Sequence, residues 1–143
     1  MDSSTKTAIE ALCAQLWERG ALEMENLDLK SLYQTAYTLY QLGRYEQAQV
    51  VFSRLVMASP YTISHWQGLG ASYQLQKHYK EALVCWSIYA LIAPKSPEPH
   101  YYAAQCYKAL NNSDEAKSAL NAAKRLVRHA TPELQRQMEV FAL

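Results

Sequence analysis

The side chains best suited to acid-base, nucleophilic or metal chemistry are scattered along this 143-residue chain. The four histidines follow no metal-ligand spacing, and no carboxylate accompanies them in a recurring arrangement. The three cysteines form no CxxC pair and no even set for disulfides, which predicts reduced, buried thiols. No GxSxG, P-loop or GxGxxG motif occurs. We therefore expect no enzyme, no metal site and no cofactor from His65, His78, His100, His129, Cys13, Cys85 and Cys106.

Tyrosine is the residue type that stands out, with eleven tyrosines against two phenylalanines. Tyr33, Tyr37 and Tyr40 recur at i, i+4 and i+7, the spacing of one face of a helix. Rigid rings that end in a hydroxyl can hold a partner's apolar side chains and still hydrogen-bond to its backbone. The sequence therefore predicts a partner-binding surface at these rings. The alternative is that a neighbouring segment of the chain covers them.

These tyrosines belong to a sequence that repeats every 34 residues. The middle copy carries the pattern of a tetratricopeptide repeat, a hairpin of two antiparallel helices: Trp66-x2-Leu69-Gly70-x2-Tyr73, then Ala82, Trp86 and Pro94. Small residues that let two helices approach, and a large residue that fills the space between hairpins, return in each copy. The positions are Ala36/Gly70/Ala104, Ala48/Ala82/Ala116 and Phe52/Trp86/Leu120.

The chain is expected to form one all-α domain, residues 1–143, because three hairpins are about the minimum for a stable stack. Gly43 suits the turn of the first hairpin, since glycine readily adopts a positive φ. The second helix of the third repeat is expected to run to about residue 129. The predicted ranges are 1–28 for an N-terminal helix and link, 29–62, 63–96 and 97–130 for the three repeats, and 131–143 for a C-terminal capping helix.

In tetratricopeptide stacks the first helix of each repeat faces a concave groove, and the tyrosine stripe falls on that face. The packing stripe of the same helix, Leu32, Ala36 and Leu39, is rotated by roughly 100°. Some tetratricopeptide domains bind the C-terminal carboxylate of a large folding chaperone through a Lys and an Asn in the groove. This chain has Tyr33, Tyr37 and Ala71 at those positions, so we do not expect it to bind a carboxylate in this way. The predicted partner-binding residues are Tyr33, Tyr37, Tyr40, Gln67, Ala71, Gln74, Tyr101, Gln105 and Lys108.

The N-terminal helix lies outside the repeat. Ile9, Leu12 and Leu16 form an apolar stripe on it, with Trp17 beside them. This stripe covers either the first hairpin of the same chain or a second copy of the chain. The sequence leaves both interpretations open, and a homodimer contact through Ile9, Leu12, Leu16 and Trp17 is one of them.

The overall charge gives no reason to expect nucleic acid as a partner. Fourteen Lys and Arg residues face 13 Asp and Glu residues, so the net charge is close to +1. The N-terminus lacks the basic start and apolar run of a signal peptide, and no stretch approaches about 18 apolar residues. We expect a cytoplasmic protein that does not insert into a membrane.

Several stretches go beyond generic repeat positions. Three of them are Leu32-Tyr33-x2-Ala36-Tyr37-x2-Tyr40-x2-Gly43-Arg44-Tyr45, Gly68-Leu69-Gly70-Ala71 and Ala103-Ala104-Gln105-Cys106-Tyr107. These three resemble the class II chaperones of bacterial type III secretion, the low-calcium-response (LcrH/SycD-like) family. The link Arg19-Gly20-Ala21-Leu22 is also similar, so the resemblance covers about residues 17 to 127. It implies three repeats after an N-terminal helical segment, and a concave face that holds an extended segment of a hydrophobic translocator before secretion.

Two functions remain open from the sequence. The first is a bacterial cytosolic chaperone that masks an aggregation-prone translocator segment until export. The second is a scaffold subunit that holds a needle or filament subunit, or another component of the secretion apparatus. Two large membrane-active proteins encoded beside this one would favour the first, and small coiled-coil proteins would favour the second.

Overall fold

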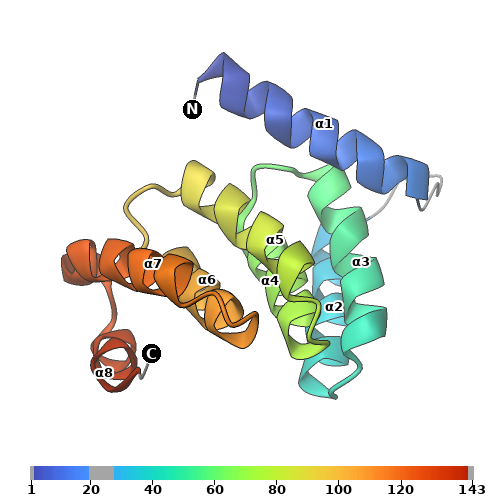
Figure 1. Ribbon diagram of the computed structural model, residues 1–143. Helices are drawn as coiled ribbons and strands as arrows, with labels where there is room; N and C mark the ends of the chain where they lie inside the picture. The colour runs from blue at the N-terminus through green and yellow to red at the C-terminus, as the bar shows by residue number, and fades with distance from the viewer. Residues whose placement is uncertain (1, 20–27, 142–143) are drawn as a thin grey trace.

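The computed structural model describes residues 2–19 and 28–141, and for residues 15–19 it describes the backbone alone. Within these ranges every regular element is a helix and no strand occurs. Figure 1 shows a row of helical hairpins with a further helix near each end of the chain. The predicted all-α fold of stacked hairpins is confirmed.

Each hairpin consists of a first helix packed against the helix that follows it. The second helix of one hairpin also packs against the first helix of the next, so the three hairpins form a continuous stack. The pairs are α2 (Leu29–Gln41) with α3 (Tyr45–Ala58), α4 (Ile63–Leu75) with α5 (Tyr79–Ile92), and α6 (Glu98–Ala109) with α7 (Ser113–Arg125).

The turn inside each hairpin contains one residue with a positive φ. Gly43 has a φ of 77°, Lys77 of 64° and Asn111 of 59°. These positions are 34 residues apart (77 − 43 and 111 − 77), so the turn repeats with the helices. Glycine adopts this conformation without steric cost, and asparagine tolerates it better than most residues. The prediction for Gly43 is confirmed.

The core follows the predicted packing positions. Ala36, Ala48, Ala82, Ala104 and Ala116 are fully buried, as expected for small residues that let two helices pack closely. The large residues between hairpins are buried as well, namely Phe52, Trp86 and Leu120. A methyl group at Gly70 would lie 3.1 Å from the Cβ of Cys85 and from the ring of Trp86, so an added Cβ would require these neighbours to shift by a few tenths of an ångström.

The end of the third hairpin differs from the expectation. Helix α7 ends at Arg125, and residues Val127–His129 form a separate 3-10 turn, η1. The backbone N–H groups of Leu126, His129 and Ala130 bond to the carbonyl three residues earlier, which is the tighter 3-10 pattern. The prediction of a helix to about residue 129 was therefore wrong by one turn. The turn redirects the chain into the next helix.

Helix α8 (Pro132–Val140) covers the third hairpin. Thr131 caps it, because its side-chain oxygen accepts a hydrogen bond from the backbone N–H of Leu134 at 3.2 Å. Leu134 and Met138 are buried in a cluster with residues of α6 and α7. These contacts give the stack the terminal cap that a solenoid requires.

Helix α1 (Ser3–Arg19) lies across α3 (Figure 1). Ile9 is 1 % exposed and belongs to the same core cluster as Leu55 and Val56 of α3. The thiol of Cys13 donates a hydrogen bond to the carbonyl oxygen of Val56 at 3.6 Å. At Ile9 and Cys13, the apolar face of α1 therefore covers the first hairpin of its own chain.

Candidate functional site

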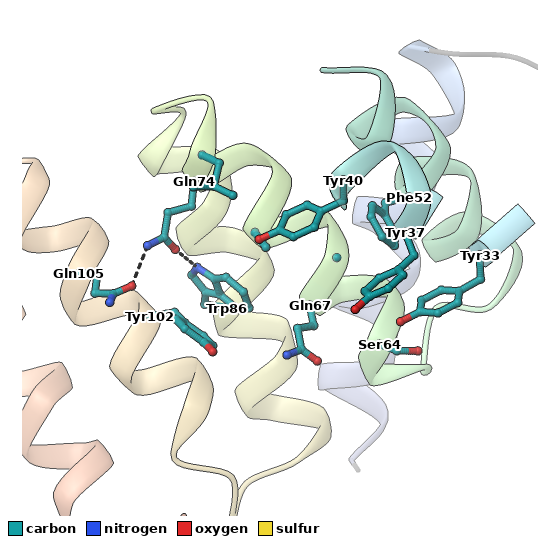
Figure 2. A pocket seen from close by; sticks show the side chains of 13 residues that line it. Tyr33, Tyr37, Tyr40, Phe52, Ser64, Gln67, Gln74, Trp86, Tyr102 and Gln105 are labelled. Atoms are coloured by element: carbon teal, nitrogen blue, oxygen red, sulfur yellow. Dashed lines mark hydrogen bonds between the residues drawn. The ribbon is translucent and has the colours of Figure 1, made fainter. Parts of the chain in front are cut away.

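A cavity of about 350 Å³ opens on the face formed by the first helices of the three hairpins. Most of its side chains project from α2, α4 and α6, while Phe52 of α3 and Trp86 of α5 reach it from the second helices (Figure 2). It is lined by Tyr33, Tyr37, Tyr40, Phe52, Ser64, Gln67, Gly68, Ala71, Gln74, Leu75, Trp86, Tyr102 and Gln105.

One end of the cavity is aromatic. The rings of Tyr33 and Tyr37 stack with centroids 6.3 Å apart, and Tyr33 meets the ring of Phe52 edge to face at 6.1 Å. Tyr37 is 48 % exposed although it is a large ring next to the core, so it is open to a partner. Burial, with smaller contributions from Tyr45 and Tyr37, raises the pKa of Tyr40. Tyr40 therefore stays protonated at neutral pH and can donate a hydrogen bond.

The position of Phe52 depends on a glycine in the facing helix. A methyl group built on Gly68 would collide with three atoms of the Phe52 ring. Because glycine has no side chain, the ring can lie directly against the backbone of α4. Phe52 therefore serves both as a core residue, 2 % exposed, and as part of the cavity wall.

The other end of the cavity carries a row of hydrogen-bonding groups. The indole Nε1 of Trp86 donates to Oε1 of Gln74 at 3.0 Å, and Nε2 of Gln74 donates to Oε1 of Gln105 at 2.9 Å. This row links α5, α4 and α6, and Figure 2 shows both bonds as dashed lines. The ring of Tyr102 packs on Trp86 with centroids 4.8 Å apart.

The cavity wall carries no formal charge at neutral pH. Among the described residues that line it there is no Asp, Glu, Lys, Arg or His. Burial, helped by Glu98, raises the pKa of Tyr102, so this phenol is protonated as well. The site therefore offers aromatic surface, amides and hydroxyls, which suit an uncharged partner with apolar side chains.

The structure brings seven of the predicted partner-binding residues together in this one cavity: Tyr33, Tyr37, Tyr40, Gln67, Ala71, Gln74 and Gln105. Tyr101 and Lys108 do not line it. Tyr101 is 6 % exposed and packs on Phe141 with centroids 5.6 Å apart, and the ammonium of Lys108 lies 5.1 Å from the centre of the same ring. The segment after α8 thus covers Tyr101, whereas Lys108 is exposed and contacts Phe141 through its ammonium.

Sequence reasoning missed three aromatic residues of the cavity, and Leu75 as well. Phe52 and Trp86 were assigned to packing between hairpins, which is also correct, because both are 2 % exposed. Tyr102 follows Tyr101 directly and was not singled out. Its only sequence signal was the doubled tyrosine, since two adjacent helical residues point about 100° apart and one of them can face the cavity.

Two of the residues proposed for a dimer contact pack against the core of their own chain. Ile9 is buried in the core, and Leu12 is partly buried against the same cluster. The side chains of Leu16 and Trp17 lie outside the described residues. The intramolecular interpretation of the N-terminal stripe thus accounts for Ile9 and Leu12.

The other chemistry-bearing side chains are dispersed in the described part of the chain. No three of the His, Cys, Asp and Glu residues there are grouped as metal ligands would be. All three cysteines are free and buried, as predicted, and burial raises the pKa of the Cys13 thiol to about 11 and that of Cys106 to about 12. Burial lowers the pKa of His65 and, together with Arg125, that of His100.

None of the described helices has the length and apolar character needed to span a bilayer.

Known proteins with the same architecture place the chain in a family. The tetratricopeptide repeat family matches residues 30–56 and 100–126, which fall in the first and third hairpins. The crystal structure of SycD, a type III secretion translocator chaperone of Yersinia enterocolitica recorded as a dimer, matches with a TM-score of 0.74 and 30 % identity. The match covers 82 % of this chain and 91 % of that one. This chain belongs to the LcrH/SycD family of class II type III secretion chaperones.

Two further members of the LcrH/SycD family show the same relationship. PcrH, solved in complex with the chaperone-binding region of PopB, has a TM-score of 0.74 and 29 % identity over 83 % of this chain and 96 % of that chain. The low calcium response locus protein H of Yersinia pestis is 33 % identical over 109 residues, or 76 % of this chain. The chain spans 65 % of the length of that relative.

Proposed function

We propose that this protein is a cytoplasmic chaperone of a bacterial type III secretion system. It binds an extended segment of a hydrophobic translocator in the cavity between α2, α4 and α6, and so prevents aggregation or premature association before secretion. The observation that carries the proposal is the uncharged cavity wall of aromatic rings and amides. Membership of the SycD family supports it, because PcrH was solved with the chaperone-binding region of PopB.

The chemistry of the wall suits an extended peptide segment. Apolar side chains of the segment pack on the rings of Tyr33, Tyr37 and Phe52, which removes both surfaces from water. Its peptide groups have donors and acceptors that need partners once they are desolvated. The glutamines and tyrosine hydroxyls of the cavity supply them. Binding of this kind needs neither a nucleotide nor a catalytic group, and we propose that the protein is not an enzyme.

The test is co-expression with candidate translocators encoded near the gene, followed by co-purification. Recovery of a hydrophobic translocator supports the proposal. Recovery of a needle or filament subunit instead would favour the scaffold function. If neither is recovered and the chaperone-binding region of PopB, offered as a peptide, also fails to bind, the proposal is contradicted.

A tyrosine variant locates the binding surface. Tyr37→Ala removes a half-exposed ring from the cavity and should weaken translocator binding by about 2 kcal/mol, roughly thirtyfold, with the unfolding free energy nearly unchanged. Tyr61→Ala is the matched control, because Tyr61 is also exposed but lies outside the cavity. Titration calorimetry measures the affinity of both. Equal affinities would show that the cavity is not the binding site.

A packing variant separates binding from folding. Leu39 lies on the same helix as Tyr37 but packs against the core cluster of the first hairpin. Leu39→Ala should lower the unfolding free energy by roughly 2–4 kcal/mol through the space it leaves in the core. Its effect on binding should follow only from the unfolded fraction, which a denaturation curve gives.

We also propose that the chain forms a homodimer, since SycD is recorded as one. Because Ile9 is buried in its own chain, the contact would use other surfaces than that side chain. Sedimentation equilibrium of the free protein tests this, and a monomeric mass at high concentration would contradict it.

A further inference from the structure

The hydrogen bonds among Trp86, Gln74 and Gln105 can run in only one direction. An indole N–H can donate a hydrogen bond but cannot accept one, so the atom of Gln74 at 3.0 Å from Nε1 of Trp86 must be its oxygen. The amide nitrogen of Gln74 is then the atom that lies 2.9 Å from Gln105, and it needs an acceptor there. Gln105 must therefore turn its own oxygen toward Gln74.

This direction decides which group of Gln105 remains available to a bound segment. Its oxygen is engaged by Gln74, and its amide nitrogen, with two N–H groups, points away from Gln74 in Figure 2. An amide that was free to rotate would offer either a donor or an acceptor. Trp86, which is 2 % exposed and held in the core, removes that choice through Gln74.

We propose that Gln105 is a fixed hydrogen-bond donor that receives a main-chain carbonyl oxygen of the bound segment. This inference rests on the proposed function and adds to it the direction of one hydrogen bond, from Gln105 to the bound segment. The segment places an acceptor against α6 while its apolar side chains lie against the tyrosines of α2. A carboxylate is a poor occupant, because the described cavity wall has no cation to compensate for the desolvation of a charge.

The first test turns Gln105 from a hydrogen-bond donor into an acceptor while leaving its side chain in place. In Gln74→Glu the carboxylate can only accept, so it keeps the bond from Trp86 and draws the amide nitrogen of Gln105 toward itself. Gln105 then presents its oxygen to the cavity. Gln67→Glu places the same charge on the same cavity wall outside the row, and so measures the effect of the charge alone.

The probe for affinity is a fluorescent peptide of the PopB chaperone-binding region, measured by anisotropy. Gln74→Glu should weaken its binding about fivefold more than Gln67→Glu. This is the loss expected when one hydrogen bond is replaced by two oxygens that face each other and can only accept, one from Gln105 and one from the peptide. The difference should persist when every Asn and Gln of the peptide is replaced by Ala, because the acceptor is a main-chain carbonyl. Equal weakening by the two variants would overturn the proposal.

A neutral pair of variants checks the same point without a charge. Gln105→Met keeps the length of the side chain and removes the donor, and should weaken peptide binding by about fivefold. Gln49→Met is its control, because Gln49 also accepts a hydrogen bond from a glutamine, Gln76, at 2.8 Å, but lies outside the cavity. Binding to Gln49→Met should match the wild type. If Gln105→Met also matches it, Gln105 is not the donor.

A second probe tests the donor independently of the cargo. N,N-dimethylacetamide has an amide carbonyl and no N–H, so it can only accept. In heteronuclear NMR spectra its addition should shift the side-chain amide signals of Gln105 in the wild type more than those of Gln49, and this difference should vanish in Gln74→Glu. If the peptide fails to bind while Gln105 shifts, the proposed cargo is wrong and the donor stands. If Gln105 and Gln49 shift equally, the donor assignment is wrong.

Discussion

At the scale of single residues, the site depends on a close approach between Gly68 and Phe52. A methyl group at Gly68 would collide with the Phe52 ring, which is itself packed in the core. At Gly70 the nearest atoms would lie at 3.1 Å, so a small shift of Trp86 and Cys85 would make room. The two glycines sit two residues apart on α4 and differ in what surrounds them.

Gly68→Ala and Gly70→Ala should therefore differ in stability. Replacing a helical glycine by alanine gains about 1 kcal/mol in helix propensity, while forcing a ring out of a packed core costs roughly 1–3 kcal/mol or more. Gly68→Ala should have the lower unfolding free energy, and Gly70→Ala should stay within about 1 kcal/mol of wild type. Urea denaturation measures both. Equal values would show that Phe52 moves aside without cost.

His65 gives stability a dependence on pH. Its ring is 6 % exposed, lies near Tyr33 with centroids 6.0 Å apart, and has Nδ1 3.4 Å from the carbonyl oxygen of Ser59. Burial lowers its pKa below the ordinary value of 6.5, so the unfolded chain binds a proton more readily than the folded chain. Stability is then greatest above pH 6.5 and falls as the pH drops below that value.

The unfolding free energy of the wild type should therefore decrease between about pH 7 and about pH 5 by more than that of His65→Gln. The lowered pKa of His100 contributes in the same direction and stays in both proteins, so the comparison isolates His65. Denaturation curves at the two pH values give the result. An identical pH dependence in the two proteins would exclude His65 as its source.

At the scale of elements, α1 tests whether a helix outside the repeat stabilises the stack. Ile9 is 1 % exposed against α3, whereas Lys6 on the same helix is exposed. Ile9→Ala should lower the unfolding free energy by roughly 2–4 kcal/mol, and Lys6→Ala should change it little. If Ile9→Ala instead leaves stability intact and lowers the sedimentation mass, the stripe contacts a second copy of the chain.

At the scale of the whole molecule, charge is nearly balanced at a net +1, and the described cavity wall is uncharged. Electrostatic binding weakens steeply when salt screens the charges, whereas apolar contacts and neutral hydrogen bonds do not. The dissociation constant for a translocator segment should change by less than about twofold between about 0.05 M and about 0.5 M sodium chloride. A loss of tenfold or more would place the main contact on a charged surface outside the cavity.

The sequence by itself determined the hairpins and most of the residues that line the cavity. The 34-residue period predicts where small and large core residues fall, because each hairpin repeats the same local packing, and the turn residues at 43, 77 and 111 follow the same period. The i, i+4, i+7 spacing was sufficient to identify Tyr33, Tyr37 and Tyr40 as one face of a helix. These features depend on contacts within one hairpin or between neighbouring hairpins, which a periodic sequence specifies.

The tertiary structure alone decided which parts of that face remain open. Phe141, which lies 40 residues beyond Tyr101 (141 − 101), packs on Tyr101 and Lys108, while Gln105 between them lines the cavity beside Tyr102. Helix periodicity gives the direction of a side chain, but the segment that covers it comes from elsewhere in the chain. The same holds for α1, whose stripe fits either its own hairpin or a partner until the fold places Ile9 beside α3.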